Sequence, residues 1–501
     1  MKNIVLFFLL ALFVNVGAAQ QITYSLPESE DVRSLDFDII GKVKNNFLVY
    51  KNIRNKYAIS VYDNSMKLKE RVDLDFMPDK TLNVDFVAYP DFAYLIYQYQ
   101  KRSTLYCMAA KIDGNGNILG KPLELDTTYI SFFADNKIYS TINSEDKSKI
   151  MVFKVQKKSD KYNFTTVLFN DSLQLLHKTR IETSFEDHKD VFSDFFVDNG
   201  GNFVFTKATR SGSRDYLESV SLITLAPTSD SFSSQVLNLN DHYLDEIKLK
   251  VDNVNDHYLI NSLYYAKKRG NVEGLYTAVW DKKSNSIVTE NFAELSDTVK
   301  SVAKTEGGIK YALNNFFIRD VILKKDGGFL LAAEDHSTQS RGNPWNRYDY
   351  LYGYPYSYNS YYSYSSPYYW YPGRRNFNSG SQMRYYYDNI IILNLDNTGK
   401  IVWSNVVHKS QFDDDTENYL SYNTMLTGGQ LHFLFNELER RTQLINDQSI
   451  SGDGKLTRYP PFRSLDRGYE FMPRYARQVS SSQVIVPCTY RNYISFAKIE
   501  F

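Results

Sequence analysis

The sequence predicts an all-β fold assembled from repeated hairpins, and one stretch shows the repeating unit clearly. In Asp388–Val407, two segments rich in β-branched and large apolar residues flank Asp396-Asn397-Thr398-Gly399, whose residue types tolerate the dihedral angles of a tight turn. Looser copies of this hairpin occur at Tyr57–Leu74, Leu105–Leu125 and Leu275–Leu295. The recurrence favours one architecture built from a repeated supersecondary unit.

A second signal, a polar or glycine-rich turn followed directly by a short apolar strand, recurs eight times. The eight strands begin at Phe47, Phe92, Ile138, Phe203, Tyr258, Phe329, Leu431 and Val484. The shortest intervals between them, 45 and 46 residues, match the roughly 40 to 50 residues of a four-stranded propeller blade. The period therefore predicts a ring of blades.

Two of the longer intervals contain insertions. Within 292–305, Leu295, Val299 and Val302 have helical spacing and follow Ser296-Asp297, a suitable helix N-cap. The other insertion, 343–387, holds fifteen tyrosines and two tryptophans but almost no aliphatic residue. This composition predicts a long loop without a core of its own, between the strand at Phe329 and the hairpin that follows.

The two ends of the chain predict how the ring closes. The last unit shows only three strand-like segments, near Phe471–Gln478, Gln483–Thr489 and Tyr493–Phe501, while Gln21–Leu26 has no partner of its own. Because an unclosed ring would present unpaired sheet edges, we expect Gln21–Leu26 to be the fourth strand of the last blade.

With these features the chain resembles β-propeller proteins, with eight blades of four antiparallel strands, or seven if one turn signal is accidental. A β-sandwich pair or a solenoid is the alternative. The chain has no WD dipeptide at the blade ends, and glycine pairs occur in only three units, so the resemblance points to no named family.

The N-terminus has the layout of a secretory signal peptide. Lys2 precedes an apolar run, Ile4–Val16, and small residues follow at Gly17-Ala18-Ala19, which predicts a signal peptide at 1–19 and one propeller domain at 20–501. A membrane anchor is the alternative, but the run is shorter than the about 20 apolar residues of a spanning helix. We expect an exported, unlipidated bacterial protein without a transmembrane segment, in the periplasm, at the outer membrane or on the cell surface.

Charge and cysteine content narrow the class further. Lys plus Arg and Asp plus Glu number 58 each, so no net charge draws the chain to nucleic acid. Cys107 and Cys488 are the two cysteines, and they either pair with each other or stay as buried thiols.

The tyrosine-rich segment supplies the candidate binding residues. Tyrosine offers a large amphipathic surface at low cost in side-chain entropy, and arginine adds cation–π or carboxylate contacts. The candidates are Trp345, Tyr350, Tyr352, Tyr354, Tyr356, Tyr358, Trp370, Tyr371, Arg374 and Arg375. The alternative is a low-complexity tether, or a loop that only covers the propeller face.

The sequence shows no zinc spacing, nucleophile elbow or phosphate-binding glycine loop, so we predict no catalytic residue and no cofactor. Four of the seven histidines, among them His336, follow an aspartate and are interpreted as exposed turn residues. The acidic residues Asp413, Asp415 and Glu417 are the candidate calcium ligands. They lack the regular spacing of a calcium loop, and such runs are usually solvated turns.

These observations favour a non-enzymatic binding or scaffold protein that engages another envelope or surface protein, as an accessory subunit of an outer-membrane assembly. The alternative is carbohydrate binding or processing, with the aromatic loop stacking on sugars. Close carboxylates in a funnel beside the loop would favour carbohydrate, whereas an exposed aromatic patch would favour a protein partner.

Overall fold

The computed structural model describes residues 21–31, 35–131, 133–134, 137–158, 161–184, 189–212, 216–268, 270–305, 308–340, 347, 383–414, 416–439, 442–462, 468–491 and 493–501. The predicted signal peptide lies outside these residues. In the described part of the chain, no helix is long and apolar enough to cross a membrane.

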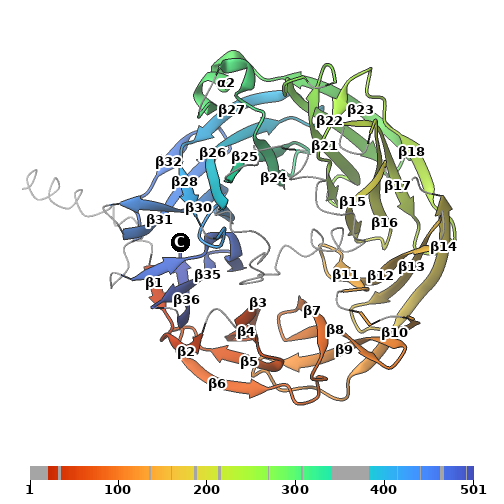
Figure 1. Cartoon of the computed structure of the whole chain (residues 1–501), viewed down its shortest axis with the longest axis vertical. Coiled ribbons are helices and arrows are strands. Elements are labelled where there is room, and N and C mark those ends of the chain that lie inside the picture. Colours follow the sequence, from red (N-terminus) through yellow and green to blue (C-terminus); the bar gives the residue numbers. More distant parts are fainter. Residues whose placement is uncertain are drawn as a thin grey trace, which may run out of the picture.

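The described strands form a ring of antiparallel sheets around a common axis (Figure 1). Seven hydrogen-bonded sheets are present, and one of them has nine strands that comprise two neighbouring blades. The described strands thus sort into eight four-stranded sets, with the first strand of each set near the axis and the fourth at the rim (Figure 1). The chain is a β-propeller, as predicted.

The blades follow one another in chain order. The first blade contains β3 (Leu35–Val43), β4 (Asn46–Ile53), β5 (Lys56–Tyr62) and β6 (Leu68–Asp73), and the second contains β7 (Thr81–Ala88), β8 (Phe92–Lys101), β9 (Thr104–Asp113) and β10 (Leu123–Tyr129). The third contains β11 (Ser140–Asn143), β12 (Lys149–Lys158), β13 (Lys161–Asn170) and β14 (Leu175–Ser184). The fourth contains β15 (Asp190–Val197), β16 (Phe203–Arg210), β17 (Leu217–Leu225) and β18 (Ser233–Val236). The fifth blade contains β20 (Lys248–Asp252), β21 (His257–Tyr265), β22 (Gly274–Asp281) and β23 (Ser286–Glu294). The sixth contains β24 (Phe316–Leu323), β25 (Phe329–Ser340), β26 (Met383–Leu395) and β27 (Ile401–Val407). The seventh contains β29 (Tyr422–Thr427), β30 (Gln430–Glu439), β31 (Thr442–Ser451) and β32 (Leu456–Arg458). A short strand, β19 (Tyr243–Leu244), pairs with both β17 and β21 and so joins the fourth and fifth blades.

The eighth blade closes the ring in the predicted way. Its inner position is shared by β33 (Tyr469–Phe471) and β34 (Arg477–Ser480), followed by β35 (Gln483–Tyr490) and β36 (Tyr493–Glu500). Its outer strands are β1 (Gln21–Tyr24) and β2 (Glu28–Asp31), which both pair antiparallel with β36. Ser25 extends the seam, because its N–H donates to Phe496 O at 2.9 Å and its Oγ accepts from Phe496 N at 3.0 Å. The N-terminal strand is therefore the fourth strand of the last blade.

One turn geometry accounts for the repeated hairpin signal. In the β26–β27 turn, Asp396 N–H donates to Lys400 O and Gly399 N–H donates to Asp396 O, both at 3.0 Å. The Asp396 carboxylate also accepts from the N–H groups of Thr398 (2.8 Å) and Lys400 (3.0 Å). Gly399 has φ +73°, the left-handed region that glycine tolerates best. The turns that begin at Asp63, Asp113 and Asn170 repeat this pattern.

Three elements differ from the sequence prediction in detail. The strand predicted near Phe471–Gln478 is divided into β33 and β34 by a 3-10 turn, Pro473–Tyr475. Ile138-Tyr139 was predicted to begin one of the eight recurring strands. The other seven of these strands are the second strands of their blades, whereas Ile138 and Tyr139 precede the first strand, β11, of their blade. The physical reason is a side chain of the preceding blade: Gln98 Oε1 accepts from the N–H groups of Ile138 (2.8 Å) and Tyr139 (2.9 Å). In the 292–305 region, helix α2 is limited to Asp297–Ala303, with Ser296 as its N-cap, because Phe292 belongs to β23.

The hydrophobic core lies mainly between the faces of neighbouring blades. One cluster, for example, joins Ile59 of the first blade to Leu95 of the second. Another joins Phe37 of the first blade to Phe496 of the eighth, across the closing seam. Cys107 and Cys488 are both buried free thiols, and burial raises the pKa of Cys488 to about 12.

Candidate functional site

The tyrosine-rich insertion starts from an extended hairpin of the sixth blade. Strands β25 and β26 are its second and third strands, and they stay paired as far as Ser340 and Met383. A short strand, β28 (Gln411–Asp413), pairs with Tyr385–Tyr387 of this extension. In an up-and-down blade, the turn between the second and third strands lies on the same side as the links between blades. We call this side the insertion face.

All ten candidate residues of the insertion, from Trp345 to Arg375, lie outside the described residues, as does Asp415. The structure does describe Arg347 and the strand from Met383 onward, so it shows how the root of the insertion is held.

Arg347 anchors the first arm of the insertion. Its Nε donates to Asp245 Oδ2 at 2.6 Å, and the hydroxyl of Tyr265 donates to the same carboxylate oxygen at 2.6 Å. Its guanidinium also lies 3.8 Å from the centre of the Phe317 ring. Burial alone would lower the pKa of Arg347, but the charge of Asp245 raises it. The buried pair ties the insertion to the fifth and sixth blades. Arg347 could not be recognised as an anchor from the sequence, because the residues around it resemble those around the other arginines of the insertion. Only the folded ring brings it beside Asp245.

Tyr387 anchors the second arm. Its side chain is fully buried, and its hydroxyl donates to Glu417 Oε2 at 2.5 Å. Arg474 donates to both groups, at 2.7 Å to the Tyr387 hydroxyl and at 3.0 Å to Glu417 Oε2. Burial would raise the pKa of Glu417, but Arg474 and the hydrogen bond from Tyr387 hold it below its ordinary value. Glu417 is thus engaged in an ion pair.

His336 packs beside this cluster, with its ring centre 4.2 Å from that of Tyr387. The prediction of an exposed turn residue was wrong, because His336 lies within β25, opposite Tyr387, and is fully buried. Burial, reinforced by the charge of Arg319, lowers the pKa of His336 to about 4. The imidazole is therefore neutral at physiological pH.

A second buried ion pair lies on the same strand. Glu334 is fully buried, and its carboxylate lies 2.8 Å from Lys409 Nζ, 3.5 Å from Arg319 Nε and 2.7 Å from the donating hydroxyl of Ser421. Lys409 Nζ also donates to the carbonyl of Tyr387 at 2.8 Å. Burial would raise the pKa of Glu334, but Lys409 and Arg319 lower it. The pair couples the root of the insertion to the seventh blade.

Asp335 differs from the other carboxyl groups at the root. Burial raises its pKa to about 7, and the nearby charge of Asp388 adds to the shift, although the hydroxyl of Thr305 donates to it at 3.0 Å. Its side chain is buried and faces the interior. At the root, Glu334 and Glu417 are therefore held in ion pairs that support the fold, whereas Asp335 is buried and has a pKa near neutrality.

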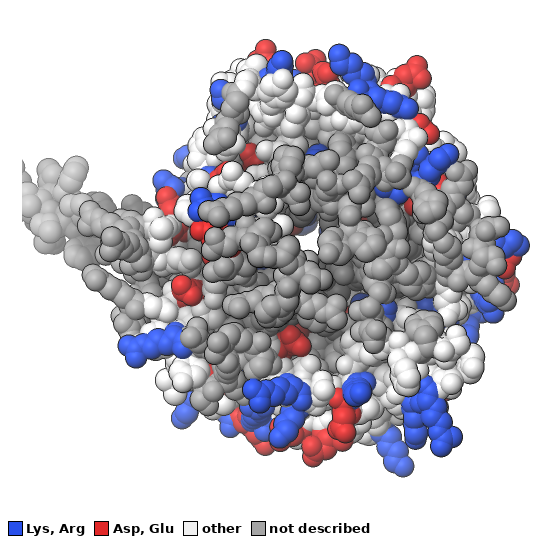
Figure 2. Space-filling model, viewed as in Figure 1, with Lys and Arg blue, Asp and Glu red and all other residues white. Residues whose placement is uncertain are grey.

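Large apolar side chains are exposed on the insertion face. Phe133 is 85% exposed and Tyr129 is 74% exposed, and both lie at the link between the second and third blades. Others on links or hairpin tips of this face are Ile309, Tyr311, Met383, Phe412, Leu438 and Tyr493. Among the described residues in Figure 2, cationic and anionic side chains are interspersed around the rim and form no large patch of one sign. The exposed apolar side chains, together with the absence of a large patch of one charge among the described residues in this view, favour contact with an apolar or aromatic surface.

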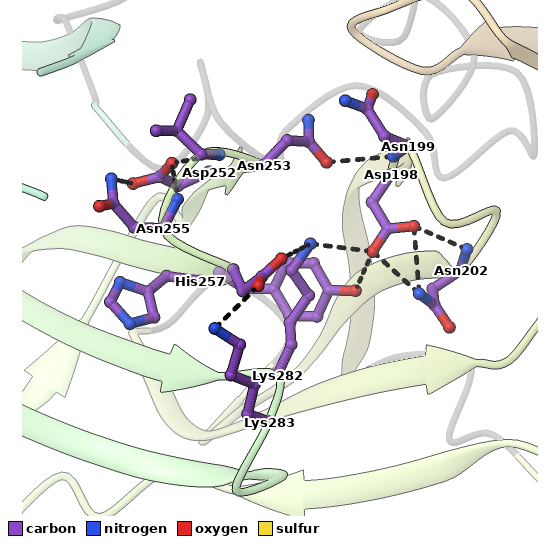
Figure 3. Close-up of polar contacts among 12 residues, drawn as sticks. Asp198, Asn199, Asn202, Asp252, Asn253, Asn255, His257, Lys282 and Lys283 are labelled. Carbon is purple, nitrogen blue, oxygen red and sulfur yellow. Dashed lines mark hydrogen bonds and ion pairs between the residues drawn. The ribbon is translucent and has the colours of Figure 1, made fainter. Parts of the chain in front are cut away.

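The opposite face carries a polar network in the turns between first and second strands (Figure 3). Asp198 accepts from the Asn202 side chain at 2.9 Å and from the Tyr258 hydroxyl at 2.9 Å, and it pairs with Lys282 at 3.1 Å. Burial would raise the pKa of Asp198, but these partners lower it. Its carboxylate serves to join the turns of adjacent blades.

Asparagine side chains extend this network across three blades. Asn253 Oδ1 accepts from Asn199 N at 3.0 Å (Figure 3), and Asn253 Nδ2 donates to Glu145 Oε2 at 2.9 Å. Among the described residues, no group of three or more His, Cys, Asp or Glu side chains is placed to hold a metal ion. Of the candidate calcium ligands, Asp413 caps the N–H of Thr416 at 2.9 Å and Glu417 is paired with Arg474.

No protein-family model and no curated protein sequence matches the chain. Among solved structures, the chain is similar to the WD40 domain of SCAP from fission yeast, with a TM-score of 0.40 and 9% identity over 96% of this chain and 98% of that one. It is also similar to the β-propeller domain of the Trilobed protease from Pyrococcus furiosus, with a TM-score of 0.36 and 9% identity over 84% and 96%. A third similar structure is the polysaccharide lyase Uly1, with a TM-score of 0.36 and 10% identity over 83% and 89%.

Proposed function

We propose that this β-propeller is an exported binding or scaffold protein that engages another envelope or surface protein of a bacterium through its insertion face. The observation that carries the proposal is the combination, on one face, of exposed apolar side chains with the root of the aromatic insertion. Exposed aromatic side chains such as Phe133 and Tyr129 are typical anchors of protein interfaces.

The ionic root supports the same proposal. Arg347 holds one arm of the insertion through Asp245, and Tyr387 holds the other through Glu417 and Arg474. Anchoring both arms fixes the points where the insertion leaves the blade. Binding of a partner then costs less conformational entropy of the insertion.

The second candidate function is carbohydrate binding, which the aromatic composition of the insertion favours. The carboxylates near the insertion are the feature expected of a carbohydrate-processing site. However, Glu334 and Glu417 are held in ion pairs with lowered pKa values, so neither is poised as a general acid.

A pull-down from solubilised envelope tests the proposal. One variant replaces residues 348–382 with a short Gly-Ser linker and so keeps Arg347 and β26. A second carries Tyr129→Ser and Phe133→Ser. The matched control carries Leu175→Ser and Val236→Ser, two exposed apolar residues of fourth strands at the rim.

We expect one envelope protein to co-purify with the native chain and the rim control, and to be lost with both insertion-face variants. Equal recovery with all four proteins would contradict the proposal. If no protein is recovered with any of them and a glycan array gives insertion-dependent binding, the carbohydrate function replaces it.

A further inference from the structure

The seventh blade contains a hydroxyl, an imidazole and a carboxylate in hydrogen-bonded series. Thr427 ends β29, His432 lies on β30 and Asp447 lies on β31. The hydroxyl oxygen of Thr427 is 2.8 Å from His432 Nε2, and His432 Nδ1 is 2.9 Å and 3.0 Å from the two carboxylate oxygens of Asp447. The three groups come from consecutive strands of one sheet.

The hydrogen-bond partners determine where the protons lie. A carboxylate accepts hydrogen bonds and does not donate them, so the proton of a neutral His432 ring resides on Nδ1, facing Asp447. Nε2 then carries the lone pair and accepts the hydroxyl proton of Thr427. An imidazole oriented by a carboxylate and hydrogen-bonded to a hydroxyl is the arrangement that activates a nucleophile for acyl transfer.

Burial and exposure are distributed as such a site requires. Asp447 is fully buried and His432 is 3% exposed, so solvent does not compete for their hydrogen bond. Thr427 is partly exposed and borders the two-residue turn of Gly428 and Gly429, with φ +51° and +85°. A Cβ built on either glycine would meet no atom within 4 Å, so the turn faces open space.

Aromatic rings line the other side of the imidazole. Tyr459 stacks on His432 with ring centres 5.8 Å apart, and Phe501 meets it edge-on at 4.7 Å. The rings hold the imidazole in place, and the open space at Gly428 and Gly429 leaves room for a small ester beside Thr427.

We propose that Thr427 is a nucleophile that reacts with small carboxylic esters, with His432 as general base and Asp447 as the positioning residue. The Thr427 oxygen bonds to the ester carbonyl carbon while its proton passes to His432 Nε2. The carbon–alkoxide bond then breaks, and the alcohol leaves with that proton. Water releases the acyl group as a carboxylic acid by the reverse proton path. The site lies on the face opposite the insertion and is independent of the proposed binding function.

Covalent labelling of the full mature chain with a fluorophosphonate probe tests the site. The Thr427 oxygen would bond to phosphorus, fluoride would leave and His432 would take the proton, so the adduct appears as a defined mass increase. Peptide mapping then locates it. The variants are Thr427→Val, Thr427→Ser and Asp447→Asn, and the matched control is Thr424→Val, on the same strand and also partly exposed.

We expect the native chain, Thr427→Ser and Thr424→Val to be labelled at residue 427, and Thr427→Val to be unlabelled there. Asp447→Asn should react more slowly by a factor of about 100 or more. Hydrolysis of p-nitrophenyl acetate should follow the same order. If the native chain is unlabelled at Thr427, or if Thr427→Val shows equal ester hydrolysis, the three groups are only a structural link. The Val and Ser variants decide the matter even if Asp447→Asn fails to fold.

Discussion

Replacing Lys409 by methionine should destabilise the propeller through the carboxylate that it leaves behind. The Lys409 side chain is 1% exposed and that of Glu334 is fully buried, so Lys409→Met would remove the nearest cation from a carboxylate that water does not reach. Breaking such a pair costs about 3–5 kcal/mol, and because Arg319 stays within 3.5 Å we expect the lower end of this range. With about 2.1 cal/mol/K of unfolding entropy per residue, a chain of 501 residues should lose roughly 3 °C in melting temperature.

Differential scanning calorimetry of the native protein and four variants measures this effect. Glu334→Gln should also destabilise, because it leaves Lys409 buried without its anion, and the double variant should be less destabilised than the two single effects added together. The control is Arg384→Met, which breaks the exposed pair with Asp414 and should leave the melting temperature unchanged. Equal shifts for Lys409→Met and the control, or strictly additive effects in the double variant, would refute the argument.

Three further predictions concern pH, the closing seam and one turn. Burial raises the pKa of Asp335 to about 7 from 3.8, so the folded state holds a proton that the unfolded state releases. As pH falls from 7 towards 4, Asp335 should therefore raise the unfolding free energy by up to about 1.4 kcal/mol per pH unit. Melting measured as a function of pH tests this, because the melting temperature of Asp335→Asn should depend less steeply on pH than that of the native protein. Ser25→Ala should cost about 1–3 kcal/mol, because it removes a buried hydrogen-bond acceptor at the seam, and faster proteolysis near the N-terminus would report it. Gly454→Ala should lower the melting temperature more than Gly120→Ala. Both glycines have positive φ, but a Cβ at Gly454 would lie 2.9 Å from the Trp403 ring, whereas a Cβ at Gly120 would meet no atom within 4 Å. Equal shifts in melting temperature for the two variants would contradict this prediction.

The parts of the fold that depend on local chemistry could be predicted from the sequence. The hairpin at Asp396 was recognisable because the residues that accept its hydrogen bonds and adopt its positive φ are neighbours in the chain. Closure by Gln21–Leu26 was predictable because a ring must pair its edges and one strand lacked a partner. Ile138 was misplaced because its N–H bonds to a side chain of another blade, which no local pattern reveals.

The candidate site was harder to predict for the same physical reason. Arg347 and Asp245 are 102 residues apart, and Glu334 and Ser421 are 87 apart, so only the folded ring brings these groups together. His336 follows an aspartate as turn histidines often do, yet its register opposite Tyr387 places it in the interior. The Thr427–His432 contact spans only five residues, but its significance depends on Asp447 from the next strand.

The closing seam also has a consequence for the folding rate. Most ladders join neighbouring strands of one hairpin and form without long loop closure, whereas Ser25 and Ser495 are 470 residues apart. The entropy of closing a loop grows as (3/2)RT ln n, which for this separation is about 5 kcal/mol. We therefore expect the blades to form first and the ring to close in the slowest step. Once the ring is closed, unfolding must first separate the strands of the seam. We therefore expect opening of the ring to be the step that limits the rate of unfolding of the native protein.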